Sequence, residues 1–247
     1  MIFRNFLNFE FRKRLPSEFG GGRIYVTGRA DARVLKFGWK GAAFDLQIVT
    51  RNIIGRDMCV WDIGANQGIL SFLAASKVGP SGSVYALEAD PHYADLIHRS
   101  SARLPAAYQP VNVLCAAISD QPGVLEFGVS AKGHARNKLL TEGDNFEVEA
   151  VKAVPAITGD ALLDVWNAPH FVKMDVEGAE FAALSGSRRI LAEVRPIFYL
   201  EVSQENVDKV SEILREFDYD IFHLKGDGQE QPIDTCSFYT IARPRVI

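Results

Sequence analysis

The sequence predicts an α/β fold: a Rossmann-like, doubly wound sheet of seven mostly parallel strands with helices on both faces, preceded by an N-terminal helical and hairpin extension. Short apolar runs alternate with helix-length segments from residue 56 onward, a pattern typical of a parallel sheet. A glycine-containing turn follows the first of these runs. The chain has 247 residues, of which 47% are hydrophobic, so it can bury the core of one large domain.

Residues 1–55 are expected to form an extension made of a helix, a small hairpin and a second helix. In the first helix, aromatic and leucine side chains at positions 3, 6, 7, 11 and 15 would share one face. Such a helix would dock on the body or on a second subunit, giving a homodimer, or else lie on a membrane surface or act as a lid. The hairpin is expected from residues 23–26 and 33–37, and the second helix from residues 43–54.

Residues 56–247 are expected to form the main domain. Its strands are predicted at residues 59–63, 83–87, 111–118, 171–176, 197–202, 219–224 and 237–242. Its helices are predicted at residues 69–77, 91–104, 159–165, 179–191 and 205–217. Between the third and fourth strands, residues 124–129 and 146–154 are expected to be antiparallel arms joined by a polar loop.

Charge and cysteine usage narrow the class of protein. Lys and Arg number 27 against 31 Asp and Glu, and this net charge of −4 disfavours a strongly basic nucleic-acid binder. Cys59, Cys115 and Cys236 are far apart and form no CxxC motif, which indicates buried thiols rather than disulfides or a zinc site. No signal peptide and no run of about 20 apolar residues stands out, so we expect a cytoplasmic protein without a transmembrane segment.

The first strand and its turn carry the strongest functional signal. Asp62 ends the strand, and Gly64 and Gly68 follow it four residues apart. The turn has neither the P-loop pattern nor G-x-G-x-x-G, which favours a nucleoside ligand without a pyrophosphate. Glu88 ends the second strand, near the offset at which an acid accepts hydrogen bonds from two ribose hydroxyls.

Two motifs resemble a known family. The D-x-G-A-N-x-G turn and the later K-x-D-V-E-G-A-E block, residues 173–180, resemble the FkbM family of class I S-adenosylmethionine (SAM) methyltransferases, over roughly residues 58–242. The resemblance implies SAM as the cofactor and O-methylation of a sugar or natural product, with a sugar, polyketide or glycolipid as the hydroxyl acceptor. It implies that SAM contacts the following residues: Asp62, Gly64, Asn66, Gly68, Glu88, Ala89, Ala117, Ser119 and Asp175.

Catalysis needs an acceptor oxygen placed in line with the methyl group and a group that removes its proton. Asp175, at the end of the fourth strand, is the first candidate, with Glu177 beginning the next helix. Lys173 shares the face of Asp175, because side chains alternate along a strand. His134, in the polar loop, is the histidine that could fold over the ligand. Alternatively, Asp175 and Glu201 could hold Mg²⁺, which would lower the pKa of the hydroxyl.

Other functions remain open at this stage. An NAD-dependent oxidoreductase would share the sheet but would need room for a pyrophosphate at the glycine turn. An RNA or protein methyltransferase is a further alternative, although no Asn-Pro-Pro-Tyr-type motif follows the fourth strand. The chain could also be a non-catalytic binding module with a methyltransferase-like fold.

Overall fold

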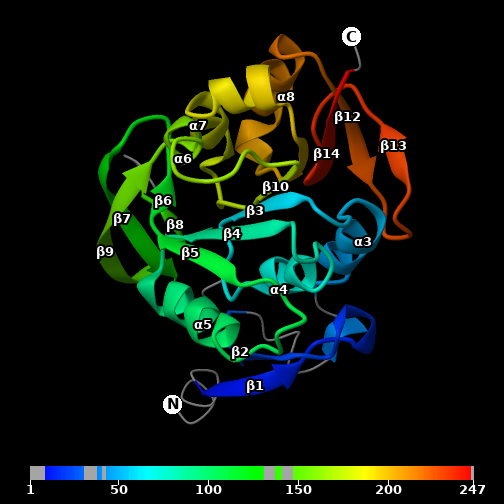
Figure 1. The fold of residues 1–247 in the computed structure, drawn as a ribbon. Coiled ribbons are helices and arrows are strands. Elements are labelled where there is room, and N and C mark those ends of the chain that lie inside the picture. The colour runs from blue at the N-terminus through cyan, green and yellow to red at the C-terminus, as the bar shows by residue number, and fades with distance from the viewer. Residues whose placement is uncertain (1–8, 31–37, 41–42, 131–136, 141–146, 246–247) are drawn as a thin grey trace.

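The computed structural model describes residues 9–30, 38–40, 43–130, 137–140 and 147–245. Its centre is a large mixed sheet (Figure 1). Among the described residues this sheet has eight strands, in the spatial order β13 (Glu230–Pro232), β12 (Tyr219–Leu224), β14 (Tyr239–Pro244), β11 (Ile197–Glu201), β10 (Phe171–Met174), β3 (Cys59–Ile63), β4 (Ser83–Glu88) and β5 (Val111–Cys115). The predicted α/β class is confirmed; the strand beyond the predicted seven is β13, a short antiparallel edge on β12.

Five neighbouring strands, from β5 to β11, are parallel, and β14 joins β11 in the antiparallel sense. All five residues of β3 are buried, as expected for a central strand covered on both faces. From β3 the chain first adds β4 and β5 on one side and later adds β10 and β11 on the other. The strand order therefore reverses between β3 and β10, which is where doubly wound sheets bind their ligands.

Helices cover both faces of the sheet (Figure 1). One face carries α3 (Phe44–Asn52), α4 (Ile69–Ala75) and α5 (Pro91–Ser101), and the other carries α6 (Gly159–Leu162), α7 (Glu180–Ser185) and α8 (Val207–Glu216). Each face buries its own apolar cluster, the first around Phe72 and Leu73 and the second around Trp61 and Leu184. Pro91 begins α5, and the Asp90 side chain caps it by accepting a hydrogen bond from the His92 amide.

The extension differs from its prediction. Glu10–Arg14 forms a strand, β1, which pairs antiparallel with β2 (Arg23–Thr27), where a helix was expected. Phe11, Lys13 and Leu15 alternate with exposed arginines, and this period of two suits a strand that lies on the body. The predicted partner of β2, residues 33–37, lies outside the described residues. The second predicted helix is present as α3.

The extension packs into the same core as the rest of the chain. Leu15, Phe19, Ile24 and Val26 are buried in the cluster that also holds α4. The Ser100 hydroxyl of α5 accepts a hydrogen bond of 2.8 Å from a backbone amide of β2. Residues 1–8 lie outside the described part of the chain, so their predicted docking or homodimer contact stays a prediction.

A second sheet stands beside the central one (Figure 1). We call it the side sheet; its order is β6 (Ala117–Ile118), β9 (Val148–Ile157), β7 (Gly123–Ser130) and β8 (Lys138–Leu139). The antiparallel pairing of β7 with β9 matches the predicted arms. The predicted strand 111–118 is divided instead, because Ala116 separates β5 in the central sheet from β6 in the side sheet. None of the helices described here is long and apolar enough to cross a membrane.

Candidate active site

The site begins where β3 and β10 end side by side. Asp62 on β3 stands opposite Lys173 on β10, and both chains turn just beyond this pair. Gly64 has a φ of 70°, and a Cβ at this position would overlap the backbone carbonyl oxygen of Asp175. Only glycine lets the two turns approach so closely. Asn66, with a φ of 52°, continues the turn in the left-handed region.

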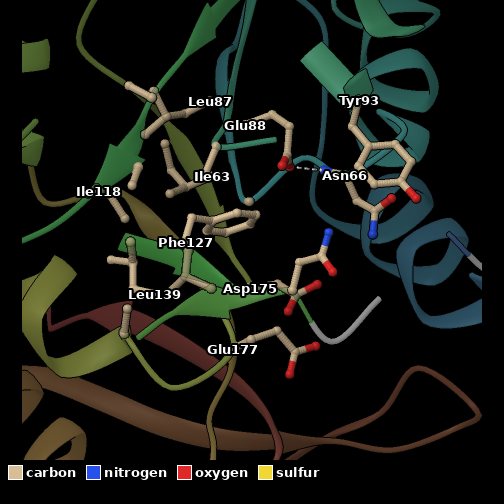
Figure 2. Close-up of a pocket in the computed structure, with 17 residues that line it drawn as sticks. Ile63, Asn66, Leu87, Glu88, Tyr93, Ile118, Phe127, Leu139, Asp175 and Glu177 are labelled. Atoms are coloured by element: carbon tan, nitrogen blue, oxygen red, sulfur yellow. Dashed lines mark hydrogen bonds between the residues drawn. The ribbon is translucent and has the colours of Figure 1, made fainter. Parts of the chain in front are cut away.

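A first cavity opens beyond these strand ends (Figure 2). We call it the cofactor cavity; it is lined by Ile63, Gly64, Asn66, Leu87, Glu88, Ala89, Tyr93, Ala116, Ala117, Ile118, Phe127, Asn137, Leu139, Asp175, Val176, Glu177 and Ala179. Figure 2 shows the apolar residues Leu87 and Ile118 on one side and the carboxylates of Asp175 and Glu177 on the other. The apolar end suits a flat heterocycle, and the polar end suits hydroxyl and charged groups.

Glu88 is the buried carboxylate of the cofactor cavity. Its two oxygens accept hydrogen bonds from the Asn66 amide at 2.6 Å and from the Asp90 amide at 2.8 Å. Burial raises the pKa of Glu88 to about 7, against the lowering effect of these two hydrogen bonds. A carboxylate has about four lone-pair sites, so Glu88 retains capacity to accept hydrogen bonds from a ligand.

Asp90 ties the side sheet to the rim of the cofactor cavity. Its side chain is buried and binds Lys152 of β9 at 2.7 Å and the Asn137 amide group at 3.3 Å. Phe127 and Leu139 of the same sheet line the cavity. The side sheet therefore forms one wall of this cavity and is held there by an ion pair with a buried acid.

A second cavity of about 490 Å³ adjoins the first. We call it the acceptor cavity; it is lined by Ala30, Ala43, Asp45, Leu46, Asp62, Ala65, Asn66, Gln67, Ile69, Leu70, Lys173, Asp175, Glu177, Glu201, Phe238 and Tyr239. Its volume lies within the range of small-molecule sites. Asn66, Asp175 and Glu177 line both cavities and so mark their junction.

Lys173 organises the charges at this junction. Its buried ammonium donates to the Gly64 carbonyl at 2.6 Å and lies 3.4 Å from both Asp62 Oδ1 and Asp175 Oδ2. Burial acts to lower the pKa of Lys173, but Asp175, Asp62 and Glu201 outweigh it and raise the pKa overall. The ammonium is therefore charged at neutral pH and serves to position the two aspartates.

The two acids at the strand ends are protonated more readily than ordinary carboxyl groups. Burial raises the pKa of Asp175, against the opposing effect of Lys173. Burial, followed by repulsion from Asp175, raises the pKa of Glu201 to about 9. Glu201 is thus neutral at pH 7 and able to donate a hydrogen bond.

The predicted Mg²⁺ site can be tested on these residues. Within the described ranges, no group of three His, Cys, Asp or Glu side chains is arranged to hold a metal ion. The cation beside Asp175 is the Lys173 ammonium, which lies 3.4 Å from both Asp62 and Asp175. This donor set does not fit Mg²⁺, which prefers several ionised or carbonyl oxygens around one point.

Glu177 and Glu180 have different roles in the structure. Glu177 is exposed at the cavity junction and has a φ of 47°, an uncommon backbone conformation for a non-glycine residue. Glu180 is buried and accepts hydrogen bonds from the Gly178 amide, Ser203 and Asn206. Glu180 therefore stabilises the loops around α7, whereas Glu177 faces the site.

The predicted SAM-binding residues divide into three groups. Gly64, Asn66, Glu88, Ala89, Ala117 and Asp175 line the cofactor cavity, and Asp62 lines the acceptor cavity. The structure does not bring Gly68 and Ser119 to the cofactor cavity: Gly68 packs near Ile97 and Phe72, and the Ser119 hydroxyl donates to Asp120. His134 lies outside the described residues, so its predicted role as the base stays a prediction.

Several lining residues were not anticipated from the sequence. Asp45 reaches the acceptor cavity from α3, and Phe238 and Tyr239 reach it from the start of β14. Asn137 reaches the cofactor cavity from the side sheet. None belongs to a motif; the one available signal was Asp45, an acid in the first turn of a helix, and that position is equally well explained by the helix dipole.

Comparisons with known proteins identify a family and a shared fold. A family model described as the methyltransferase FkbM domain matches residues 62–221. The hexuronic acid methyltransferase AglP of Haloferax volcanii is 28% identical over 141 residues, 56% of this chain and 53% of that protein, so the chain spans about half the length of this relative. The solved structure of methyltransferase FkbM from Methylobacillus flagellatus KT has a TM-score of 0.51 at 19% identity, covering 80% of this chain and 47% of that chain, which shows a shared fold.

Proposed function

The chain belongs to the FkbM methyltransferase family, and on this basis we propose that it transfers a methyl group from SAM to a hydroxyl of a small sugar-like acceptor. The observation that carries the proposal is the position of Asp175 at the junction of two cavities. One cavity has the lining of a nucleoside site, and the other has the size and polarity of a small-molecule site.

The cofactor cavity fits SAM in its donor set. The apolar residues Ala89, Ile118 and Leu139 would surround the adenine, and Glu88 would accept hydrogen bonds from the ribose hydroxyls. The buried Asn66 Oδ1 has no hydrogen-bond partner among the described residues, so it is available to the methionine ammonium. When bound, SAM supplies a methyl group that its sulfonium has already activated.

Asp175 is the general base of the proposed reaction. With SAM bound, the Asp175 carboxylate would take the hydroxyl proton as the acceptor oxygen bonded to the methyl carbon and displaced the sulfonium sulfur. Burial makes this carboxylate more basic than an exposed aspartate, which favours proton removal. The Lys173 ammonium, 3.4 Å from Asp175 Oδ2, holds this side chain in place and favours the ionised form of Asp175. Glu177 forms the rim of the same junction.

A sugar-like acceptor is supported by two observations. The relative from Haloferax volcanii is named a hexuronic acid methyltransferase, although it shares only part of its length with this chain. The acceptor cavity also combines carboxyl groups with the aromatic rings of Phe238 and Tyr239. Carboxyl groups can bind hydroxyls, and aromatic rings supply apolar area to the faces of a pyranose ring.

Methyl-labelled SAM tests the proposal directly. The wild-type protein is incubated with a set of methyl pyranosides, and products are identified by mass spectrometry and NMR. Asp175→Asn should lower kcat by about 10²- to 10⁴-fold, the usual contribution of a general base, while SAM binds within a few-fold of the wild-type affinity. The control is Asp164→Asn, an exposed change at a residue that pairs with Arg189 and lines neither cavity. Methyl transfer to nitrogen or carbon, or a wild-type kcat in Asp175→Asn, would overturn the proposal.

A further inference from the structure

Asp45 lines the acceptor cavity, and the proposed reaction assigns it no role. We infer that Asp45, held in place by Tyr199, accepts hydrogen bonds from hydroxyls of the acceptor and thereby selects a neutral sugar over a uronic acid. This inference rests on the proposed function, because it assigns the specificity of the same site. Asp45 would be a specificity-determining residue contributed by the N-terminal extension, and Tyr199 a positioning residue.

Tyr199 fixes the direction of the Asp45 side chain. The Tyr199 ring is fully buried in the middle of β11, and its hydroxyl donates a hydrogen bond of 2.6 Å to Asp45 Oδ2. Asp45 belongs to the first turn of α3, where an acid also suits the helix dipole. The bond to Tyr199, however, directs this carboxylate toward the central sheet. A buried tyrosine that holds a half-buried carboxylate beside a cavity gives that carboxylate a defined orientation.

The Asp45 carboxylate keeps free hydrogen-bonding capacity. In the part of the chain that the structure describes, Tyr199 is its one hydrogen-bond partner. An ionised carboxylate can only accept hydrogen bonds and has about four sites for them. The groups that complement it on a ligand are donors, which a sugar presents as hydroxyls. Asp45 also contributes to the raised pKa of Glu201, after burial and Asp175, so its electrostatic field extends toward the reacting end of the cavity.

The charges around the cavity disfavour an anionic acceptor. Among its described lining residues, Lys173 carries the one positive charge, against four acids besides the protonated Glu201: Asp45, Asp62, Asp175 and Glu177. The Lys173 ammonium already lies between Asp62 and Asp175, so it is not available to a ligand carboxylate beside Asp45. A uronic acid in this cavity would place its carboxylate among like charges, which is unfavourable. A neutral pyranose avoids this repulsion.

An aromatic wall completes the subsite. Phe238 is 55% exposed at the rim of the cavity, and its ring meets Tyr239 edge-on at 4.8 Å. Tyr239 in turn stacks on Tyr199 at 6.2 Å. The aromatic residues therefore connect the rim to the tyrosine that holds Asp45. A ring that rests on Phe238 would turn its hydroxyls toward the carboxylate side of the cavity.

Two probes and three variants test the inference. The probes are methyl α-D-glucopyranoside and its uronic acid counterpart, methyl α-D-glucopyranosiduronic acid, and their binding to the full chain is measured by calorimetry and saturation-transfer NMR. The wild-type protein should bind the neutral probe more tightly. Asp45→Asn should lower the affinity for the neutral probe by about 10-fold and raise the affinity for the uronic acid, because it removes both a hydrogen-bond acceptor and a repulsive charge. Tyr199→Phe should lower the affinity for the neutral probe by a smaller factor and should not raise the affinity for the uronic acid.

Glu18→Gln is the matched control, because it removes one negative charge from the same extension at an exposed pair with Arg51. Glu18→Gln should change the affinity for neither probe. Equal weakening of both probes in Asp45→Asn, unchanged binding of both, or no binding of either probe to the wild type would overturn the inference. Methyl transfer is scored separately with labelled SAM. Selective binding without methyl transfer would contradict the proposed function while leaving the role of Asp45 supported.

Discussion

The ionisation of Glu88 should have opposite effects on the stability of the ligand-free protein and on its affinity for SAM. The group is only 7% exposed, and its pKa in the folded protein is about 7, against an ordinary value of 4.5. A folded-state pKa above the unfolded value means that the native protein holds this proton more tightly. The contribution of this proton to the free energy of unfolding is fully present below about pH 4.5 and is lost as the pH rises through about 7. The difference corresponds to about 3 kcal/mol in the free energy of unfolding.

Glu88→Gln removes the titrating carboxyl, but its amide nitrogen cannot accept, so one of the two hydrogen bonds from the Asn66 and Asp90 amides is lost at every pH. This loss should lower the free energy of unfolding of the variant by about 1–3 kcal/mol at about pH 4.5. Between about pH 4.5 and about pH 8 the wild type should lose about 3 kcal/mol more than the ligand-free variant, because only the wild type comes to bury a charge. Affinity for SAM should fall by about 10- to 100-fold at the higher pH, because the ionised acceptor of the ribose hydroxyls is lost.

Urea unfolding of the ligand-free protein at the two pH values measures the first effect, and titration calorimetry with SAM measures the second. Glu216→Gln, an exposed change on α8, supplies the baseline for the substitution itself. Parallel stability curves for wild type and Glu88→Gln would refute the cost assigned to burial. Equal SAM affinity in the two proteins would remove Glu88 from the cofactor site.

Three further outcomes follow from the same geometry. Lys173→Met should lower the free energy of unfolding, measured in urea, by about 3–5 kcal/mol, because Asp62 and Asp175 lose the buried ammonium between them; wild-type stability would show that this ion pair contributes little. Phe238→Ala should raise the acceptor KM by about 10-fold with little change in kcat, and a change confined to kcat would contradict a stacking role. Exhaustive chelation should leave turnover unchanged, since the ammonium of Lys173 stands between those aspartates; activity that is lost and then restored by Mg²⁺ would revive a metal at Asp175.

The methyltransferase assignment was readable from local sequence because its chemistry lies in contiguous segments. The glycine turn after β3 and the block that begins at Lys173 each combine a buried strand with the residues that follow it. Parallel strands bring such ends together whatever the loops do, so Asp62, Glu88 and Asp175 could be expected near one another. These segments predicted the FkbM family, and the match of the FkbM domain over residues 62–221 confirms it.

The conformation of the N-terminal extension could not be predicted from the hydrophobic pattern alone. The N-terminal aromatic residues fit a helical period, yet residues 10–14 form a strand, because β2 and α5 offer a surface on which a strand can bury alternate side chains. A short segment with mixed periodicity has no strong preference of its own. Its conformation is decided by the surface against which it packs.

The sequence by itself determined the α/β class, the succession of the central strands along the chain and the acids at their carboxyl ends, since these follow from hydrophobic runs and from turns built within one stretch of chain. Only the tertiary structure decided which of these residues meet. The Lys173 ammonium lies between Asp62 and Asp175, one of the two acids proposed for a metal, because two strands distant in sequence lie side by side in register. Asp45 reaches the acceptor cavity because a tyrosine 154 residues away holds it there. Contacts of this kind depend on packing between distant segments, and no local pattern in the chain encodes them.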